Sequence, residues 1–488
     1  MVTKEQERRV VEDVAKGLYI DGRWIEASSA KRFEVEDPST GEMLCEVADA
    51  DGGDAVRALD AAAAAQKEWA GKPPRDRAEI LRRAWEVITE RVDDLALLMT
   101  LEMGKSLAES KAEIAYGADF FRWFAEEATR IEGNYQVSAN GQGRTLVMRQ
   151  PVGPCVLVTP WNFPLAMGTR KIGPAIAAGC TMVMKPAGAT PLSMNALTQI
   201  LEEAGLPSGV LNTITTTSSS ETVGPLLEDP RTRKLSFTGS TEVGRRLMEQ
   251  ASQNLLRVSM ELGGNAPFIV FDDADLDAAV EGAMLAKMRN IGESCVAANR
   301  FYVAEPVVDE FAGRLSDEMA ALKVGRGTDP DVSVGPLINE AQRQKVTELV
   351  DDATGRGAKC VLGGKAREGA GYFYEPSVLT GITPDARLLK EEIFGPVAPI
   401  ASFSSDDDAI DAANDTEFGL VAYVFTRDIK RALRVIEKLD TGMVGLNKGI
   451  VSNPAAPFGG VKHSGFGREG GREGIHEYLA VKNVAIDM

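Results

Sequence analysis

The chain has 488 residues, which is long enough for about two or three domains and a large buried core. Its 54 basic and 72 acidic residues give a formal charge of −18, which argues against nucleic acid and anionic membrane surfaces as main partners. The five cysteines are widely spaced without a CxxC pair, and with two histidines in the chain no metal site is expected.

The amino terminus and the cysteines bear on the compartment. Residues 1–16 are densely charged and lack the apolar stretch of a secretion signal. No run approaches the roughly 18 uninterrupted apolar residues that a membrane span needs. Few, unclustered cysteines are typical of a reducing compartment. We therefore expect a cytoplasmic protein.

The predicted secondary structure changes along the chain. Residues 18–48 are typical of short strands separated by turns. Residues 54–130 predict amphipathic helices, because apolar side chains recur every three or four positions, and Pro73-Pro74 separates two of them. Residues 135–150 predict a hairpin with Asn140-Gly141 at its turn.

Alternating strands and helices follow this hairpin. Four apolar runs, each followed by a helical pattern, occupy residues 156–159, 181–185, 210–214 and 234–237. A second such series extends from Phe268 to about residue 450, and a last strand is predicted at 481–486. This alternation predicts an α/β fold with doubly wound parallel sheets, helices covering both faces.

Two segments carry side chains suited to covalent catalysis. Cys295 follows Gly292-Glu293-Ser294, and Glu261 opens the segment Glu261-Leu262-Gly263-Gly264-Asn265. A thiol and a carboxylate, each beside small residues that let a ligand approach the backbone, suggest a nucleophile with a separate acid/base group. A cysteine taken alone is more often a small buried apolar residue, so the other motifs must decide.

Two further segments could hold a nucleotide. The strand ending at Phe237 continues into Thr238-Gly239-Ser240 and then a helix expected from Arg245 to Gln253. The free N–H groups and the dipole at a helix start attract anions, although an ordinary capped helix is the alternative because the spacing matches no standard fingerprint. Lys185 ends another predicted strand, at the edge where doubly wound sheets bind ligands, and an ordinary solvated lysine is its alternative.

Taken together, these segments resemble the aldehyde dehydrogenase superfamily from the first strands to the carboxyl terminus. The matching motifs, in the family's order, are Pro160-Trp161-Asn162-Phe163-Pro164, Met184-Lys185-Pro186-Ala187, Phe237 to Gly244, Glu261 to Pro267, the Cys295 segment, Glu391 to Pro396, and Pro457-Phe458-Gly459-Gly460. Any one of them could arise by chance, but their common order could not.

The resemblance implies a subunit of three parts. These are a cofactor-binding domain (1–129 and 149–260), a catalytic domain (261–457), and an oligomerisation element with the carboxyl-terminal segment (130–148 and 458–488). Family members are homodimers or homotetramers. Strands left unpaired by one chain would add to a sheet of a neighbouring subunit.

The resemblance also assigns chemical roles. Cys295 attacks the aldehyde as a thiolate, and the Asn162 amide together with the Cys295 backbone N–H holds the oxyanion. The thiohemiacetal gives up a hydride to the nicotinamide, and Glu261 then activates water to hydrolyse the thioester. The residues implied to bind the cofactor are Trp161, Lys185, Gly188, Gly239, Ser240, Leu262, Glu392 and Phe394.

Gly188 favours NADP over NAD as the cofactor. NAD-preferring relatives often carry a glutamate at this position, which would repel a 2′-phosphate. Glycine removes that repulsion, and Lys185 then becomes a useful counter-charge. NAD remains possible.

Two arginines indicate the substrate. Arg170, eight residues after Asn162, and Arg289, six before Cys295, match positions with which succinate-semialdehyde-oxidising members of the family grip a carboxylate. Ser452 would supply a third donor, although each arginine could instead make a structural ion pair. We therefore expect succinate semialdehyde as the substrate, with glutarate semialdehyde or another ω-carboxylated aldehyde as the alternative.

Other functions fit less well. Two cations in the site would oppose the quaternary ammonium of betaine aldehyde, and Glu261, the implied hydrolytic base, disfavours a CoA-acylating enzyme. A structural protein that had lost activity would not need intact Cys295, Glu261 and Asn162. Some members form a reversible disulfide through a second cysteine, but Ala297 stands at that position here, so this switch is not expected.

Overall fold

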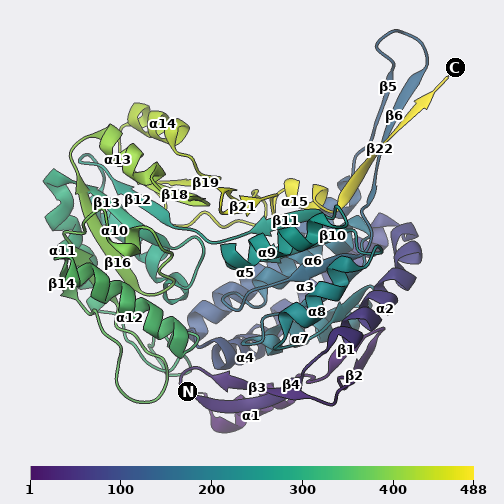
Figure 1. The fold of residues 1–488 in the computed structure, drawn as a ribbon, viewed down its shortest axis with the longest axis horizontal. Helices are drawn as coiled ribbons and strands as arrows, with labels where there is room; N and C mark the ends of the chain where they lie inside the picture. Colours follow the sequence, from purple (N-terminus) through teal and green to yellow (C-terminus); the bar gives the residue numbers. More distant parts are fainter. Residues whose placement is uncertain (1, 488) are drawn as a thin grey trace.

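The computed structural model describes residues 2–487 and contains two large α/β sheets and a projecting arm (Figure 1). Pro74 begins α3 directly after α2 has ended, as Pro73-Pro74 predicts, because proline is tolerated only in the first turn of a helix. The amino-terminal elements are α1 (Lys4–Glu12), β1 (Leu18–Ile20), β2 (Arg23–Ile25), β3 (Arg32–Asp37), β4 (Glu42–Ala48), α2 (Gly52–Gly71), α3 (Pro74–Glu90), α4 (Val92–Met103), α5 (Leu107–Glu127) and η1 (Ala128–Arg130).

The first large sheet has the strand order β2-β1-β9-β8-β7-β10-β11-β21. The chain fills one side of β7 with β8 and β9 and then crosses to the other side with β10 and β11. Ligands of such sheets bind where the strand order reverses, at the carboxyl ends of the strands, which here means the loops after β7 and β10. Its elements are β7 (Cys155–Val158), α6 (Ala166–Ala178), β8 (Met182–Lys185), α7 (Pro191–Glu203), β9 (Leu211–Thr213), α8 (Ser219–Glu228), β10 (Lys234–Thr238), α9 (Thr241–Ser252), β11 (Arg257–Glu261) and β21 (Gly465–Phe466).

The second large sheet has the order β14-β15-β16-β13-β12-β18-β19. Its strands are almost continuously apolar because helices cover both faces, and Phe268 at its centre packs against Phe301, Phe311 and Phe425. Its elements are β12 (Ala266–Val270), α10 (Leu276–Met288), η2 (Arg289–Gly292), β13 (Ala298–Ala304), η3 (Glu305–Val307), α11 (Val308–Ala320), α12 (Glu340–Gly355), β14 (Lys359–Leu362), β15 (Ser377–Thr380), η4 (Arg387–Leu389), β16 (Val397–Phe403), α13 (Asp406–Asn414), β18 (Val421–Phe425), α14 (Ile429–Lys438) and β19 (Met443–Leu446).

The sheets are parallel in their interiors and mixed at their edges. The predicted α/β alternation is confirmed for both series of strands. At the edges the sheets are mixed, because β1, β14 and β21 run antiparallel to their neighbours. Parallel pairing of consecutive strands needs a long crossover connection, usually a helix. A strand that the chain reaches by a short turn, or from a distant segment, needs no such crossover and can pair in either direction.

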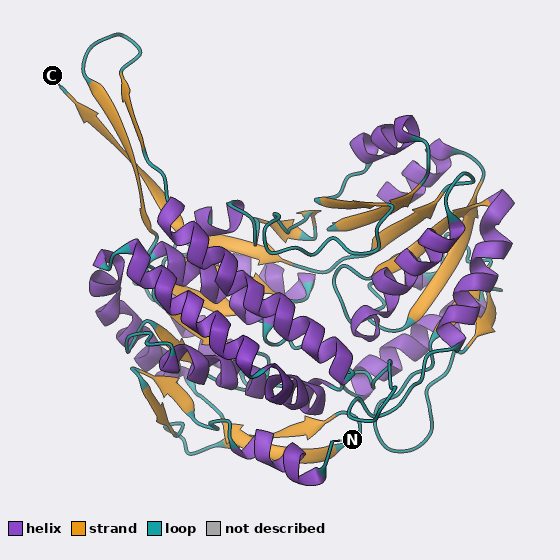
Figure 2. Cartoon of the chain, turned by 180° about the vertical axis from the view of Figure 1, so that it is seen from behind, coloured by secondary structure: helices purple, strands orange, loops and turns teal. Residues whose placement is uncertain are grey.

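The arm consists of β5 (Asn134–Val137), β6 (Arg144–Pro151) and β22 (Leu479–Ile486). The predicted hairpin is confirmed, with Gly141 in the left-handed region at its turn. Figures 1 and 2 show that these strands extend well beyond the two large sheets, and Tyr135, Val137 and Val481 expose more than half of their surface. Of the remaining elements, β17 (Phe418–Gly419) precedes β18 and pairs with β20 (Val461–Lys462), and α15 (Glu473–His476) precedes β22.

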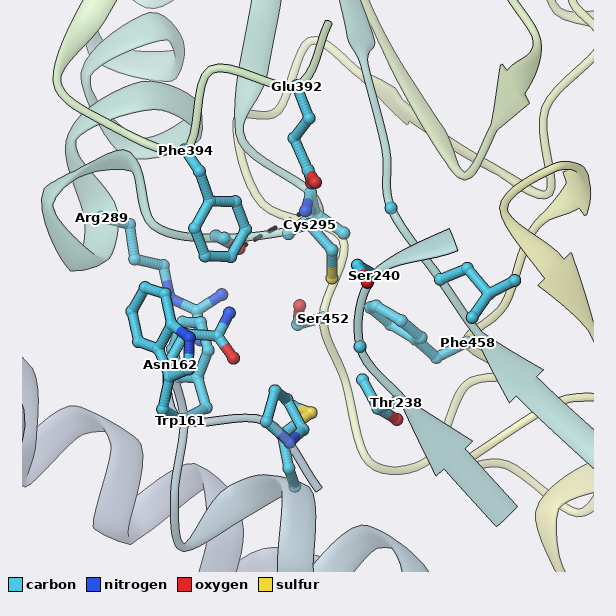
Figure 3. A pocket seen from close by; sticks show the side chains of 18 of the residues that line it. Trp161, Asn162, Thr238, Ser240, Arg289, Cys295, Glu392, Phe394, Ser452 and Phe458 are labelled. Atoms are coloured by element: carbon cyan, nitrogen blue, oxygen red, sulfur yellow. Dashed lines mark hydrogen bonds between the residues drawn. The ribbon is translucent and has the colours of Figure 1, made fainter. Parts of the chain in front are cut away.

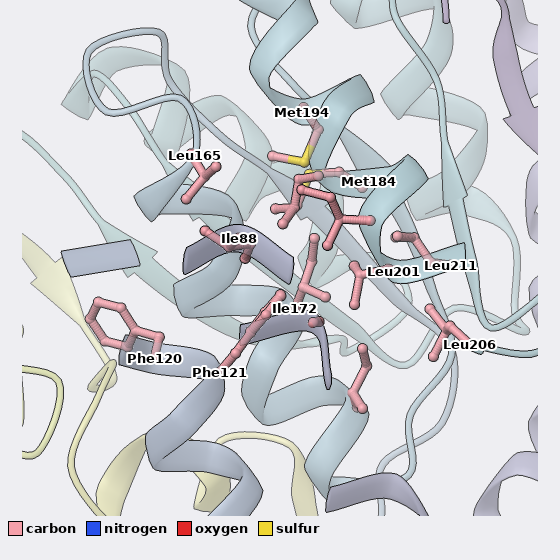
Figure 4. Packing of buried hydrophobic residues seen from close by; sticks show 14 of the residues in the cluster. Ile88, Phe120, Phe121, Leu165, Ile172, Met184, Met194, Leu201, Leu206 and Leu211 are labelled. Carbon is pink, nitrogen blue, oxygen red and sulfur yellow. The ribbon is translucent and has the colours of Figure 1, made fainter. Parts of the chain in front are cut away.

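Close packing of α5 against α6 determines where the loop after β7 lies. The core between these helices is drawn in Figure 4 and includes Phe120, Phe121, Leu165 and Ile172. A Cβ at Gly117 of α5 would lie 2.5 Å from Leu165 Cδ2, so only glycine permits this approach. Among residues 2–487, no helix is long and apolar enough to cross a membrane.

Candidate active site

A cavity of about 230 Å³ lies where the loops after β7, β10 and β11 face the second sheet. Cys295, Asn162, Arg289 and Ser452 surround this space in Figure 3. The structure brings to the same cavity seven more residues that the sequence predicts for the site, Trp161, Arg170, Gly239, Ser240, Leu262, Glu392 and Phe394. Glu261, Lys185 and Gly188 are not among its lining residues.

A tight turn directs Cys295 toward the cavity. Asn290 and Ile291 have φ values of 56° and 63°, a left-handed conformation that is strained for a β-branched side chain. A Cβ at Gly264 would lie 2.2 Å from the Cys295 carbonyl oxygen, so the Glu261 segment can approach the nucleophile only through glycine. The small residues noted around both motifs therefore serve close backbone contact.

Asn162 is held by a buried network. Its backbone carbonyl accepts from Lys105 Nζ at 2.8 Å and from Asn290 Nδ2 at 3.0 Å. Lys105 also forms a fully buried ion pair of 2.5 Å with Glu113. The Asn162 Nδ2 group donates to the Glu293 carbonyl at 3.0 Å, which leaves its second hydrogen for another acceptor. The amide is thus oriented before any oxyanion forms.

The pKa of Cys295 is raised to about 12, chiefly by desolvation and then by the nearby Glu392 carboxylate, while Arg170 opposes the shift. Because the thiolate is the reactive form of a cysteine, the ligand-free protein holds Cys295 mostly in its unreactive, protonated form at neutral pH. A bound ligand that adds positive charge would lower this pKa.

This raised pKa predicts the pH dependence of alkylation. Without ligands, the rate of Cys295 modification by iodoacetamide should rise about tenfold per pH unit from about pH 7 to pH 10, because the thiolate fraction grows through this range. An exposed thiol, with a pKa of about 8.5, would level off within it. Peptide mass spectrometry separates Cys295 from Cys45, which is also half-buried, and from the exposed Cys360. A plateau for Cys295 below about pH 9 would contradict the desolvated thiol.

Glu261 ends β11 and is 2% exposed, with no hydrogen-bond partner for either carboxylate oxygen among residues 2–487. Burial and the nearby Glu469 hold its pKa well above the ordinary value, and Lys171 and Arg170 oppose this. A carboxylate with a raised pKa is a stronger base than a solvated one. Glu261 therefore suits proton abstraction from water, from a position just behind the cavity wall.

Glu392 and Phe394, which the sequence predicts to bind the cofactor, precede β16 and are fixed by backbone contacts. Glu392 accepts from the Gly264 N–H at 3.1 Å, and desolvation raises the pKa of Glu392 to about 7. Gln342 Nε2 donates to the carbonyl of Phe394 at 2.7 Å, and the Phe394 ring meets Trp161 edge-on at 5.4 Å. These contacts hold both motifs in place without a bound ligand.

Helix α9 begins at Thr241, four residues earlier than predicted, because Ser240 caps it. The Ser240 hydroxyl accepts from the Val243 N–H at 3.4 Å, and its own proton remains available to another acceptor. The helix is therefore capped by Ser240, as the alternative interpretation expected, and this cap is still compatible with anion binding.

Lys185 fits a group that carries negative charge. It is 6% exposed, so the alternative of a solvated lysine was wrong, and burial lowers its pKa to about 8. Within the described chain no carboxylate lies within 4.0 Å of its ammonium group. A buried ammonium without an anion suits a ribose or phosphate that a dinucleotide would bring.

The two arginines differ in their surroundings. Arg170 is 2% exposed, with Nε 3.4 Å from Glu469 Oε2 and its guanidinium 4.1 Å from the Phe458 ring. Arg289 stacks over Phe163 at 5.0 Å and forms no ion pair within the described residues. The structural ion-pair alternative therefore applies to Arg170 and not to Arg289.

Several residues in and near the cavity were not predicted from the sequence. Tyr116 comes from α5, and Gln342 and Lys345 come from α12, two amphipathic helices without a motif. Glu469 accepts from buried Lys171 at 2.6 Å. Its setting among glycines, Gly467-Arg468-Glu469-Gly470, was the one signal that could have pointed to it.

Comparison with known proteins agrees with this geometry. The aldehyde dehydrogenase family matches residues 24–484. A succinate-semialdehyde dehydrogenase of Paenarthrobacter nicotinovorans is 58% identical over 91% of this chain and 99% of its own. A glutarate-semialdehyde dehydrogenase of Pseudomonas aeruginosa is 48% identical over 96% and 97%. The crystal structure of an E. coli NADP dependent enzyme, 49% identical, superposes with a TM-score of 0.96 over 97% of this chain and 98% of that one. The chain belongs to the aldehyde dehydrogenase family.

Proposed function

We propose that this protein oxidises succinate semialdehyde to succinate with NADP. The observation that carries the proposal is the Arg289 guanidinium, which lines the same cavity as Cys295 and has no ion-pair partner among residues 2–487. A cation left uncompensated in a half-buried site is costly unless a ligand supplies the anion. Ser452, on the same cavity wall, adds a hydroxyl donor.

The residues of the site suit a two-stage reaction. The Cys295 thiolate attacks the aldehyde carbon, and the Asn162 amide and the Cys295 N–H stabilise the resulting oxyanion. NADP, when bound, supplies the hydride acceptor. Glu261 then removes a proton from the water that attacks the thioester, the C–S bond breaks, and succinate and the Cys295 thiolate are released. The lack of ion pairing at Arg289 among residues 2–487 and the orientation of the Asn162 amide both favour this series of reaction steps.

NADP is the cofactor that the residues present favour. Lys185, buried without an anionic partner among residues 2–487, and Gly188, without a carboxylate, would together accept an additional phosphate. Trp161, Gly239, Ser240, Leu262, Glu392 and Phe394 would hold the rest of the molecule. The relationship to an NADP dependent enzyme of E. coli supports the same choice.

Glutarate semialdehyde is the second candidate substrate, supported by the relative from Pseudomonas aeruginosa. It carries the same carboxylate one methylene further from the aldehyde. A pocket discriminates one methylene by only about 1–3 kcal/mol, so both compounds should react and their ratio measures pocket length.

The assembly and its division into domains follow the family pattern in our proposal. The exposed apolar side chains of the arm suit pairing with a second copy as a homodimer or homotetramer. Residues 1–129 with 149–260 would bind the cofactor, 261–457 would carry catalysis, and 130–148 with 458–488 would join subunits. We place the protein in the cytoplasm.

Arg289→Ala tests the proposed substrate. Relative to wild type, kcat/KM for succinate semialdehyde should fall roughly 10- to 150-fold, because a charged hydrogen bond to the carboxylate is lost. The kcat/KM for butanal, which has the same chain length and no carboxylate, should hardly change. Both are measured from NADPH absorbance.

The matched control is Arg314→Ala, since Arg314 pairs with Asp277 and Glu310 on the surface. An unchanged preference for the carboxylated aldehyde in Arg289→Ala would overturn the substrate proposal. A higher catalytic efficiency of wild type with NAD than with NADP would overturn the cofactor proposal.

A further inference from the structure

Tyr116 is a cavity residue that none of the sequence motifs includes. It lies on α5, is half-buried, and lines the cavity together with Arg170, Arg289 and Cys295. Its hydroxyl accepts a hydrogen bond from Arg170 Nη2. The Arg289 guanidinium lies 5.6 Å from the centre of its ring. The phenol therefore contacts both arginines of the site.

The contact with Arg170 decides which way the Tyr116 proton can point. A guanidinium can only donate, so the hydroxyl oxygen must act as acceptor toward Arg170. The phenolic O–H is then directed elsewhere, and no group in residues 2–487 accepts it. Because the side chain lines the cavity, this hydroxyl is a donor available to a ligand.

Arg170 lines the same cavity but is less free than Arg289 to act as a cation for a ligand. Its Nε faces Glu469 at 3.4 Å, its Nη1 lies 3.8 Å from Met167 Sδ, and its plane rests on Phe458. Glu469 therefore compensates part of its charge, whereas Arg289 has no such partner. Arg170 is bound on several sides, and one of these contacts orients the Tyr116 hydroxyl.

The same face of α5 fixes Tyr116 relative to the oxyanion donor. Glu113, one turn earlier, accepts from the N–H groups of Leu165 and Ala166 at 3.0 and 3.1 Å. Gly117, the next residue, packs directly on Leu165. The loop that carries Asn162 and the Tyr116 hydroxyl are thus held by one rigid helix, which fixes the span between the two ends of a substrate.

We infer that Tyr116 is a specificity-determining residue, whose hydroxyl donates to the carboxylate of the substrate, and that Arg170 is a positioning residue that orients this hydroxyl. The carboxylate would then rest between the Arg289 guanidinium, the Ser452 hydroxyl and the Tyr116 hydroxyl. The inference rests on the proposed function, because it requires a carboxylated aldehyde as substrate.

Tyr116→Phe is the test, since it removes only the hydroxyl and keeps the ring beneath Arg289. The ratio of kcat/KM for succinate semialdehyde to kcat/KM for butanal should fall about tenfold or more, chiefly through KM, because a hydrogen bond to a charged group is lost. The matched control is Tyr372→Phe, whose hydroxyl donates to Glu36 far from the cavity and whose loss should leave the ratio unchanged.

The wild-type ratio distinguishes a failure of the proposed role of Tyr116 from a failure of the proposed function. If wild type prefers succinate semialdehyde and Tyr116→Phe keeps that preference, the role of Tyr116 is overturned while the proposed function stands. If wild type prefers butanal, the proposed function itself fails.

Arg170→Met, made alone and together with Tyr116→Phe, tests the positioning role. An Arg170 that acts through Tyr116 lowers the ratio in the wild-type background and hardly lowers it further in Tyr116→Phe. Equal losses in both backgrounds would mean that Arg170 holds the carboxylate itself, which would overturn its positioning role. Because the ratio compares two substrates on one protein, a general loss of active enzyme cancels.

Discussion

Cys295→Ala should lower the rate of aldehyde oxidation on the order of 10⁴-fold or more, because it removes the nucleophile that forms the covalent intermediate. The hydroxyls of Ser294 and Ser452 line the same cavity but are far weaker nucleophiles than a thiolate. NADPH formation gives the rate. NADP binding, followed by quenching of protein fluorescence, should persist, since Trp161 and the other proposed cofactor residues are unchanged.

Cys360→Ala provides the matched control, because Cys360 is an exposed thiol on β14 of the second sheet. It should retain the full rate. Residual activity of Cys295→Ala above about one per cent of wild type would show that another group performs the attack.

Glu261→Gln should separate the two stages of the reaction. Hydride transfer should still occur once per subunit, giving a rapid burst of NADPH, while steady-state turnover falls about 10²- to 10⁴-fold because the attacking water has lost its general base. Stopped-flow absorbance measures the burst. Intact-protein mass spectrometry should detect the accumulated acyl-enzyme, which the wild type hydrolyses.

The raised pKa of Glu261 determines the pH dependence of this second stage. The carboxylate is the active base and forms as pH rises through the pKa, so hydrolysis by wild type should accelerate with pH and by Glu261→Gln should not. Glu249→Gln, an exposed carboxylate of α9, should behave as wild type. Slow turnover without a burst in Glu261→Gln would place the role of Glu261 before acylation and refute its assignment.

Much of the fold could be predicted because it depends on local patterns. The apolar runs that became β7, β8 and β10 and the helical periodicity of α3 and α4 are properties of neighbouring residues. The antiparallel edges could not be predicted in this way, because β21 joins Glu261 to a segment near the end of the chain. Such pairing depends on where the chain returns in space, which periodicity does not report.

The candidate site likewise contains residues that could be predicted from local patterns and residues that could not. Motif residues such as Cys295, Asn162 and Glu392 could be identified because small residues and turns beside them leave a local signature. Lys185 was located correctly, but its burial was not evident, since the elements that cover it lie elsewhere in the sequence. Tyr116 had no signature at all, because it differs from any other half-buried tyrosine of an amphipathic helix only in what faces it.

The sequence by itself determined the set of candidate groups: a thiol, a carboxylate, an amide and two arginines in an order that few unrelated chains would share. Only the tertiary structure decided which of the arginines is free to bind an anion. Arg170 lies against Glu469 and Tyr116, whereas Arg289 lies over two aromatic rings and forms no ion pair among residues 2–487. The physical reason is that the strength of a charge in a site depends on its distance from other charges and on its burial. Those distances join residues that are far apart along the chain.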